Sequence, residues 1–256
     1  MTLGDRQELL VLATDIAMEA GRLLVDRLTK VRTAISSKST ATDMVSEVDR
    51  ESEALIVRRI LAVRPDDAIL GEEDTERTGT SGLRWVIDPL DGTTNYLYGI
   101  PAFCVSIGVE DAEGVAAGVV YEPVRRELFS AARGTGAFRD GRAIRTSSQA
   151  KLPLALLGTG FGYDAGRRRK QANRLVRVLP AVRDIRRAGS AALDLCSVAC
   201  GRLDGYFEEG LQAWDYSAGS LIVAEAGGRF ERNPNGLVVA SGSALFDQLA
   251  KLVRLR

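Results

Sequence analysis

Residues 85–95 constrain the fold and the chemistry of this chain more than any other part of the sequence. They begin with the apolar run at residues 85–87, which is typical of a buried strand and which leads directly into Asp88. Pro89 lacks a backbone N–H donor, so we expect it to stop the strand pairing. Asp91 follows shortly after. The segment therefore predicts a strand end that carries two carboxylates close together.

These two carboxylates, with the Leu90 carbonyl between them, are the hard oxygen ligands that Mg²⁺ prefers. Residues 92–95, Gly-Thr-Thr-Asn, favour a helix start, whose free backbone N–H groups bind anions. A cation site beside an anion site indicates phosphate chemistry. The structural alternative is that Asp88 caps a loop and that Asp91 and Gly92 form an ordinary turn. Two aspartates on either side of a proline, directly after a buried strand, favour the functional interpretation.

The absence of histidine is the most decisive feature of the composition. It excludes Ser-His-Asp and Cys-His catalysis and zinc sites of the HExxH type. Cysteines occur only at positions 104, 196 and 200, too few N/S ligands for a zinc site, and we interpret Cys196 and Cys200 as buried thiols on one helix face. A catalyst here must use carboxylates, hydroxyls, backbone dipoles or metals.

Charge and length limit the partners and the domain organisation. The 34 Lys and Arg residues balance 34 Asp and Glu residues, so net charge gives no reason to expect a nucleic acid or a membrane surface as partner. No signal pattern and no apolar run of about 18 residues is present, so we expect a cytoplasmic protein. The 256 residues suffice for one large or two smaller domains. The pattern changes near residue 147, which predicts two halves, residues 1–146 and 147–256.

Hydrophobic periodicity predicts the order of helices and strands. Apolar residues at helical spacing predict a helix over residues 5–28 and a second one from Ser46, where Asp49 completes a pattern close to a capping box. Further helices are predicted at residues 189–200, 216–226 and 244–252. Strands are predicted at residues 68–70, 85–87, 103–110, 115–121, 127–131, 154–157, 184–186, 205–208 and 237–240, those from 103 to 131 as an antiparallel meander.

Three short motifs are open to more than one interpretation. Gly134 and Gly136 lack the strand–helix context of a nucleotide loop, so we reject that function. The basic run at residues 167–170 is interpreted as a solvated helix start, with an anion or partner contact as the alternative. Glu73 and Asp74 are interpreted as surface residues.

The segment WVIDPLDGTTN at residues 85–95 resembles the signature of the inositol monophosphatase family, which comprises lithium-sensitive, metal-dependent phosphatases. The sequences GEED at 71–74, WDYSAG at 214–219 and EAGG at 225–228 stand in the order of that family, so the resemblance covers nearly the whole chain. It implies the αβαβα sandwich of the inositol monophosphatase and fructose-bisphosphatase type. In that fold an α+β amino-terminal half carries most metal ligands, and an α/β carboxy-terminal half completes the substrate site.

The resemblance also implies two or three Mg²⁺ ions and a set of catalytic residues. Glu72 and Thr93 would orient the attacking water, Asp49 would hydrogen-bond Thr93, and Lys38 would be linked to a metal. The metal ligands implied are Glu72, Asp88, the Leu90 carbonyl, Asp91 and Asp215. The substrate contacts implied are Asp91, Gly92, Thr93, Gly189, Ser190, Ala191, Glu208 and Asp215. From the residues alone, Asp215 could also cap the helix that follows it.

The activity implied is hydrolysis of inositol 1-phosphate by a homodimer. Sister phosphatases acting on fructose 1,6-bisphosphate, a nucleotide phosphate or histidinol phosphate stay open as alternatives, although Thr94 resembles the inositol branch, since histidinol-phosphate relatives often carry lysine there. The alternative from another class is a partner-binding protein linked to transcription. Gln212 departs from the animal members, which often carry histidine at that place.

Overall fold

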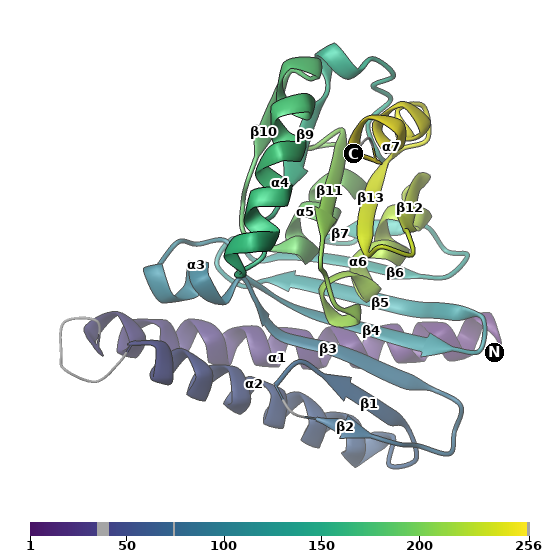
Figure 1. Cartoon of the computed structure of the whole chain (residues 1–256). Helices are drawn as coiled ribbons and strands as arrows, with labels where there is room; N and C mark the ends of the chain where they lie inside the picture. Colours follow the sequence, from purple (N-terminus) through teal and green to yellow (C-terminus); the bar gives the residue numbers. More distant parts are fainter. Residues whose placement is uncertain (35–40, 74, 255–256) are drawn as a thin grey trace.

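The computed structural model describes residues 1–34, 41–73 and 75–254. In these ranges the chain forms alternating layers of helices and sheets (Figure 1). Helices α1 (Leu3–Ala34) and α2 (Ala41–Val63) cover the outer face of the larger sheet. Helices α5 (Ala191–Ala199) and α6 (Ala213–Glu225) separate that sheet from a smaller one, and α4 (Ala165–Val178) and α7 (Phe246–Arg254) lie outermost. This arrangement confirms the expected αβαβα sandwich.

The larger sheet contains eight strands of the described residues, in the order β2-β1-β3-β4-β5-β6-β7-β8. Strands β1 and β3 are parallel, and β3 to β8 form antiparallel pairs, which confirms the predicted meander. A Cβ atom at Gly118 would lie 2.9 Å from the Ala218 carbonyl, so glycine lets α6 approach the sheet closely. The strands are β1 (Ala68–Gly71), β2 (Glu76–Arg77), β3 (Arg84–Asp91), β4 (Cys104–Asp111), β5 (Gly114–Glu122), β6 (Glu127–Ala132), β7 (Ala137–Arg139) and β8 (Arg142–Ala143).

The smaller sheet has the order β10-β9-β11-β13-β12 in the described part of the chain. Strands β10, β9 and β11 are mutually parallel, so their carboxyl ends share one edge of the sheet. The strands are β9 (Leu156–Thr159), β10 (Asp184–Arg186), β11 (Gly205–Glu209), β12 (Gly228–Arg232) and β13 (Leu237–Gly242). The sequence did not predict β12, which pairs with β13 at the edge.

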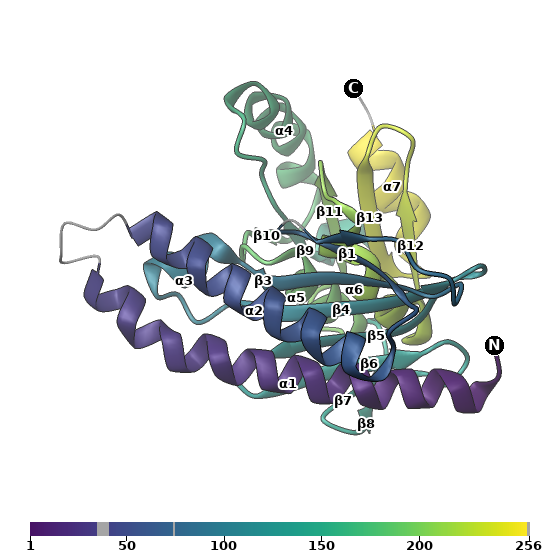
Figure 2. The ribbon, with the colours of Figure 1, turned by 90° about the horizontal axis from the view of Figure 1, so that it is seen from below.

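Apolar residues fill the spaces between the layers. Figure 2 shows α1 and α2 side by side beneath the larger sheet, where Ile16, Ile56 and Trp85 are buried. A second core lies between the two sheets around α5 and α6, and a third lies under α4 and α7. The division near residue 147 stays a prediction. No helix in the described ranges is both long and apolar enough to cross a bilayer.

Several element boundaries differ from those predicted. Helix α1 runs on to Ala34, and α2 begins at Ala41, so Ser46 lies inside the helix and is not its cap. Leu154 belongs to a short 3₁₀ turn, Leu152–Leu154, and not to the strand. Helix α6 begins at Ala213, earlier than expected. Lys38 and Asp74 lie outside the described residues.

Strand β3 continues through Pro89, contrary to the expectation that proline would end the pairing. Asp88 pairs with Ser106 and Asp91 pairs with Cys104, and the register shifts between these two pairs. Such a bulge leaves residues unpaired, so the missing N–H of Pro89 costs the sheet no hydrogen bond. The bulge also sets the directions of the two aspartates.

Candidate active site

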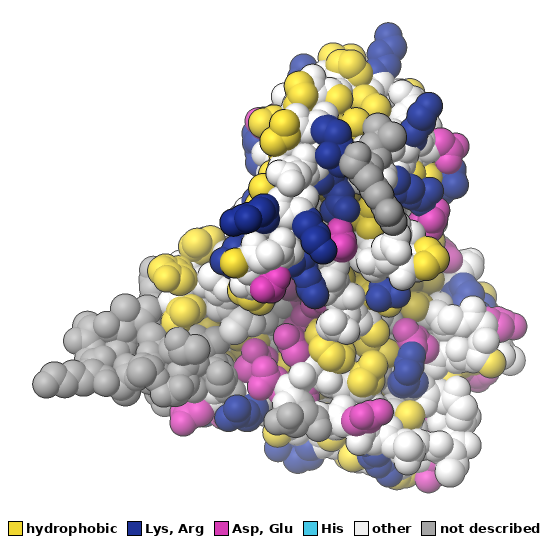
Figure 3. Space-filling view, in the orientation of Figure 1, with side chains coloured by type: hydrophobic (Ala, Val, Ile, Leu, Met, Phe, Trp, Pro, Cys, Tyr) yellow, Lys and Arg dark blue, Asp and Glu magenta, His cyan; other side chains and the backbone are white. Residues whose placement is uncertain are grey.

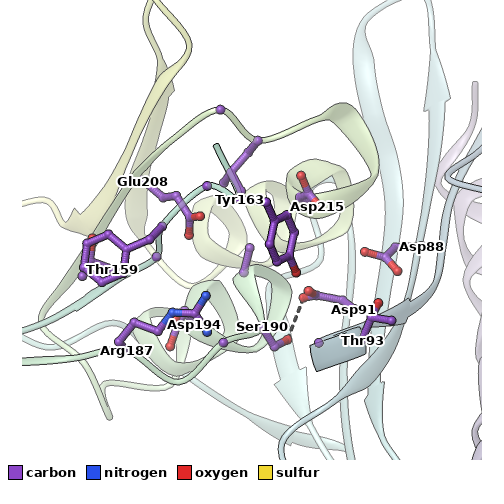
Figure 4. A pocket seen from close by; sticks show the side chains of 18 of the residues that line it. Asp88, Asp91, Thr93, Thr159, Tyr163, Arg187, Ser190, Asp194, Glu208 and Asp215 are labelled. Atoms are coloured by element: carbon purple, nitrogen blue, oxygen red, sulfur yellow. Dashed lines mark hydrogen bonds between the residues drawn. The ribbon is translucent and has the colours of Figure 1, made fainter. Parts of the chain in front are cut away.

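The carboxyl end of β3 places two buried aspartates beside a cleft. Asp88 and Asp91 are 1% and 8% exposed. The backbone N–H of Leu90 donates to Asp88 Oδ1 at 3.0 Å, which fixes that carboxylate within the bulge. Figure 4 shows Asp88 and Asp91 with Asp215 on one side of the pocket. The predicted pair of carboxylates at a strand end is therefore present, and α6 adds a third.

Gly92 makes the sharp turn from β3 into α3 (Thr93–Tyr98). Its φ of 97° lies in the left-handed region, and a Cβ there would stand 2.9 Å from the Ala102 carbonyl, so both conformation and space require glycine. The turn brings Thr93 back over the bulge, where its hydroxyl donates to the Leu90 carbonyl at 3.1 Å. The helix start expected at this position is confirmed.

One cavity collects nearly all of the residues that the sequence singled out. Those that line it are Glu72, Asp88, Leu90, Asp91, Gly92, Thr93, Gly189, Ser190, Ala191, Glu208 and Asp215. They come from both sides of residue 147 and from five separate stretches of the chain. Asp49 does not line the cavity.

Asp49 lies buried on α2 behind the site, 2% exposed. Its Oδ1 has no hydrogen-bond partner within the described ranges, and the expected bond from Thr93 is not made, because that hydroxyl donates to Leu90. Burial, then repulsion from Glu73 and Glu72, raises the pKa of Asp49 to about 9. Asp49 is thus close enough to Glu72 for the two carboxylates to repel each other.

Asp91 joins the larger sheet to α5. Its Oδ2 accepts hydrogen bonds from the Ser190 hydroxyl at 2.6 Å and from the Ala192 backbone N–H at 2.7 Å. Ser190 also caps α5 by accepting from the Leu193 N–H. The Ala192 N–H is therefore committed to a carboxylate, while Gly189, Ser190 and Ala191 line the cavity.

Asp215 is held by the first turn of α6. Its Oδ2 accepts from the Gln212 backbone N–H at 2.6 Å, and the Gln212 side chain completes a reciprocal capping box. Asp215 therefore does help to cap α6, as one interpretation of the sequence expected. It does so from the third position of the helix, because the cap residue itself is Gln212. It coexists with a place on the cavity wall.

Glu72 sits in a loop that is fixed by a buried acid of α2. Glu53 is 4% exposed; its Oε2 accepts from the Glu73 N–H at 2.9 Å, and its Oε1 accepts from the Thr75 N–H at 3.1 Å and the Thr75 hydroxyl at 2.6 Å. A Cβ at Gly71 would collide with the Glu53 carboxylate. Glu73 is half-buried, and one of its carboxylate oxygens lies 3.7 Å from Nε of the exposed Arg50, so it is a surface residue held in an ion pair.

The acidic side chains of the cleft resist ionisation. Burial, followed by repulsion from Glu72 and Asp91, raises the pKa of Asp88 well above its usual range. Burial also raises the pKa of Asp91, offset in part by its bond to Ser190. For Asp215, burial and then Asp91 raise the pKa to about 8. Glu72 is exposed to solvent on one side. Partial burial of its carboxylate, and then repulsion from Asp91, raise the pKa of Glu72 to about 7.

This cluster fits divalent cations. No Lys or Arg of the described chain forms an ion pair with its four acids, so positive charge must come from elsewhere if they ionise together. As the described side chains are placed, no three His, Cys, Asp or Glu residues stand in an arrangement that could hold a metal ion, so these acids would have to turn toward a cation to bind it. The donors are all oxygen, which suits Mg²⁺ better than zinc. The hydrogen bonds from Ser190 and Ala192 to Asp91, and from Gln212 to Asp215, all engage Oδ2 of the carboxylate.

The opposite wall of the cavity contains residues to which the sequence assigned no role, apart from Arg167 in the basic run at 167–170, for which an anion contact was the alternative. They follow the carboxyl ends of the parallel strands of the smaller sheet, where ligands bind in open α/β sheets. The spacing of strands and helices after residue 147 could have indicated these positions. The additional lining residues are Thr159, Gly160, Phe161, Gly162, Tyr163, Arg167, Arg187, Asp194, Glu209, Gly210 and Leu211.

Tyr163 reaches across the cleft. Its hydroxyl lies 3.2 Å from the Thr94 hydroxyl, although the residue is 81% exposed. On the far side, Glu208 accepts from the Tyr206 hydroxyl at 2.5 Å, and Figure 4 shows Glu208, Asp194 and Arg187 grouped away from Asp88. In Figure 3 acidic side chains gather near the middle of the view, where the layer of the smaller sheet meets that of the larger sheet. Basic side chains lie over the upper part of the view, which contains the smaller sheet with α4 and α7. The cavity thus has an acidic side and a mixed side.

Comparison with known proteins finds similar chains over most of the length of this one. A family model described as "Inositol monophosphatase family" matches residues 5–253. A relative from Mycobacterium tuberculosis H37Rv, "Inositol-1-monophosphatase SuhB", is 49% identical over 205 residues, which cover 77% of this chain and 71% of the relative. A relative from Xylella fastidiosa, "Nus factor SuhB", is 45% identical and covers 83% of this chain and 77% of the relative.

A solved structure shares the fold. The structure titled "Mycobacterium tuberculosis SuhB" superposes with a TM-score of 0.86 at 42% sequence identity, and covers 97% of this chain and 96% of that chain. Because the superposition spans both sheets, the similarity concerns the complete layered fold and is not confined to one half.

Proposed function

Because the chain belongs to the inositol monophosphatase family, we propose that it is a Mg²⁺-dependent phosphate monoesterase that hydrolyses myo-inositol 1-phosphate. The observation that carries this proposal is the cluster of buried carboxylates at the end of β3, joined by Asp215 on α6 and lacking a cationic partner among the described side chains. The name of the relative from Mycobacterium tuberculosis supports the choice of substrate.

The metal ligands follow from this cluster. Glu72, Asp88 and the Leu90 carbonyl would hold one Mg²⁺, and Asp88, Asp91 and Asp215 a second, with a third, weaker ion as in several families of this superfamily. When bound, Mg²⁺ supplies positive charge that polarises the phosphate and lowers the pKa of a water molecule.

The protein's own groups orient the reactants. Glu72 and Thr93 position the attacking water, since both side chains line the cavity beside Leu90. Backbone N–H groups of Gly92 and Thr93 bind phosphate oxygens as negative charge moves onto them. Glu208 accepts hydrogen bonds from substrate hydroxyls, and its bond from Tyr206 engages Oε2, which leaves Oε1 for that purpose.

A phosphatase assay tests the proposal. The protein is supplied with Mg²⁺ and a panel that contains inositol 1-phosphate, fructose 1,6-bisphosphate, a nucleotide phosphate and histidinol phosphate. We expect inositol 1-phosphate to give the highest kcat/KM, exhaustive chelation to abolish turnover, and Li⁺ to inhibit. Turnover that survives chelation would contradict the metal mechanism, and a different best ester would replace the substrate.

A second candidate function is a partner role in transcription, because the Xylella fastidiosa relative is named a Nus factor. This role would be independent of catalysis. A pull-down of the transcription machinery with the intact protein and with Asp88→Asn tests it: equal recovery supports the role, and no recovery with either protein argues against it. We also propose a homodimer from the family resemblance, which light scattering would measure.

A further inference from the structure

A second cavity, with a volume of about 700 Å³, lies between α4, the end of α7 and the turn that joins β12 to β13. Ligand pockets in proteins have volumes of this order. Among the described residues, Glu209 alone lines both this cavity and the active-site cavity. None of the proposed metal ligands, all of which the structure describes, lines it. It is therefore a separate space that the proposed mechanism does not use.

Four cationic side chains line this second cavity, which we call the basic cavity. Helix α4 contributes Lys170, Arg174 and Arg177, which are four and three positions apart and so lie on one face of the helix. The end of α7, which packs against α4, contributes Arg254. Within the described ranges, Glu209 is the only acidic residue of the lining. Like charges on neighbouring positions repel one another, so the basic cavity favours an anion.

The surrounding acids neutralise these cations only in part. Glu209 pairs with Arg174 through a single contact, from Nη2 to Oε2 at 2.7 Å. Arg254 pairs with Glu231, which lies outside the lining of the basic cavity. Lys170 is exposed and makes no ion pair or hydrogen bond with the part of the chain that the structure describes. Positive charge therefore exceeds negative charge around this space.

Asn233 adds a neutral donor to the same lining. Its Oδ1 accepts hydrogen bonds from the backbone N–H groups of Asn235 at 3.0 Å and Leu237 at 2.9 Å, which fixes the turn between β12 and β13. The oxygen is thus engaged, and the NH₂ group of the amide, which can only donate, is left for another acceptor. No aromatic side chain of the described residues lines the basic cavity, so nothing there would stack on a nucleobase.

We propose that the basic cavity binds a small anion with two or more linked phosphate groups, either an inorganic polyphosphate or the phosphate chain of a nucleotide. Lys and Arg side chains bind phosphate oxygens through charge-assisted hydrogen bonds. The cations come from two helices, so several linked phosphates would contact both helices, whereas a single phosphate would neutralise fewer of them. This binding site goes beyond the proposed phosphatase function and does not depend on it.

Glu209 links the basic cavity to the active site. Its backbone carbonyl accepts from Gln171 Nε2 at 3.1 Å, and Gln171 Oε1 accepts from the Gly162 N–H at 3.0 Å, so α4 is joined to two loops of the active-site wall. An anion bound to Arg174 competes with Glu209 for the guanidinium. The released carboxylate would then repel a phosphate ester in the active-site cavity and raise the KM of the substrate. This link, unlike the binding itself, rests on the proposed phosphatase function.

Calorimetric binding of tripolyphosphate tests the site without turnover. The protein is first freed of divalent cations, which could otherwise hold the anion at the carboxylates of β3. We expect Lys170→Gln and Arg254→Gln each to weaken binding about tenfold, as for the loss of one charged hydrogen bond. Arg169→Gln is the matched control, because it removes the same charge from α4 outside the lining of the basic cavity.

The choice of anion identifies the source of the phosphates. Inorganic phosphate should bind more weakly than tripolyphosphate. ATP that binds as tightly as tripolyphosphate supports recognition of the phosphates alone, and tighter binding of ATP would identify a nucleotide as the ligand. The proposal is overturned if tripolyphosphate does not bind, if inorganic phosphate binds as tightly, or if Arg169→Gln weakens binding as much as Lys170→Gln does. Misfolding does not explain a loss in Lys170→Gln, since this exposed side chain has no contact to lose.

Inositol release from inositol 1-phosphate at constant free Mg²⁺ tests the link through Glu209. Tripolyphosphate should raise KM to a plateau without changing kcat, and Glu209→Gln should remove this effect while calorimetric binding persists. A KM that rises without limit would show competition at the active site and refute the link. A protein that binds tripolyphosphate through Lys170 but hydrolyses no ester would refute the phosphatase function and keep the site. Hydrolysis without tripolyphosphate binding would do the reverse.

Discussion

Replacing Glu53 by glutamine should loosen the loop that carries Glu72. The glutamine carbonyl can still accept from Thr75, but its NH₂ group would face the Glu73 N–H, where the carboxylate now accepts a bond of 2.9 Å. Two donors then meet in a buried site, and a buried donor left without a partner costs about 1–3 kcal/mol. At roughly 2–4 °C per kcal/mol for a chain of this size, Tm should fall by roughly 2–12 °C.

The same change should weaken metal binding, because Glu72 lies between Gly71 and the Glu73 N–H that Glu53 holds. Loss of a group that orients a ligand typically lowers metal affinity about 10- to 100-fold. Calorimetric unfolding in the presence of chelator measures the stability, and Mg²⁺ titration calorimetry measures the affinity. Glu47→Gln is the matched control, since Glu47 is exposed on the same helix and loses the same charge.

Two results would refute this reasoning. If Glu53→Gln lowers Tm but binds Mg²⁺ as tightly as the parent protein, the loop position does not govern the ligand, or Glu72 is not one. If neither Tm nor Mg²⁺ affinity differs from the Glu47→Gln control, the three hydrogen bonds to Glu53 do not fix the conformation of the loop that carries Glu72.

The remaining predictions concern the site itself. Asp88→Asn removes a charge shared by two cations and should lose Mg²⁺ binding and activity together, whereas Thr93→Ala should keep Mg²⁺ binding and lose on the order of 10²–10³ in kcat, as for one positioned catalytic group; equal loss of metal in both variants would make the hydroxyl structural. Glu208→Gln should change KM or substrate ranking with Mg²⁺ affinity retained, and a large fall in that affinity would place Glu208 among the metal ligands. Burial and repulsion raise the pKa of Asp215 from 3.8 to about 8, so its contribution to the stability of the chelated protein is fully present below about pH 4 and is lost as the pH rises to 8. Tm in chelator should therefore fall between pH 5 and 8, and the rise in Tm on adding Mg²⁺ should be larger at pH 8 than at pH 5; a Tm in chelator that rises over this range would contradict the burial of these acids.

Local sequence signals predicted most elements of the fold, because each strand and helix carries its own hydrophobic period. The runs at residues 103–110, 115–121 and 127–131 gave the meander, and Asp88 and Asp91 marked the site, since strand, proline and acids are adjacent in the sequence. The ends of helices and strands were less well predicted where contacts with other elements override the local preference of a residue. Pro89 is accommodated by a bulge, and Ser46, which resembles a cap, lies within α2.

The contribution of distant side chains could not be predicted from local patterns. Glu53 resembles any acid on a helix, and only the packed structure shows that it holds a loop 20 residues away. Arg167 is one of four consecutive basic residues, and the loops at Gly162 and Gly210 decide that it is the one in the cleft. Such choices depend on contacts between elements, for which a single sequence carries no periodic signal.

The hydrogen bond from Ser190 to Asp91 spans 99 positions of the chain, and this has a consequence for how the catalyst comes into existence. A nascent chain that has emerged only as far as β8 already contains Glu72, Asp88 and Asp91, and β4 already pairs with Asp91, yet the hydrogen bonds from Ser190 and Ala192 to the Asp91 carboxylate cannot form until α5 docks. Contacts between residues so far apart in sequence form late, since the chain must first lose the entropy of a long loop. Docking of α5 then also completes the candidate site, so we expect a form of the chain in which α5 is undocked to lack phosphatase activity.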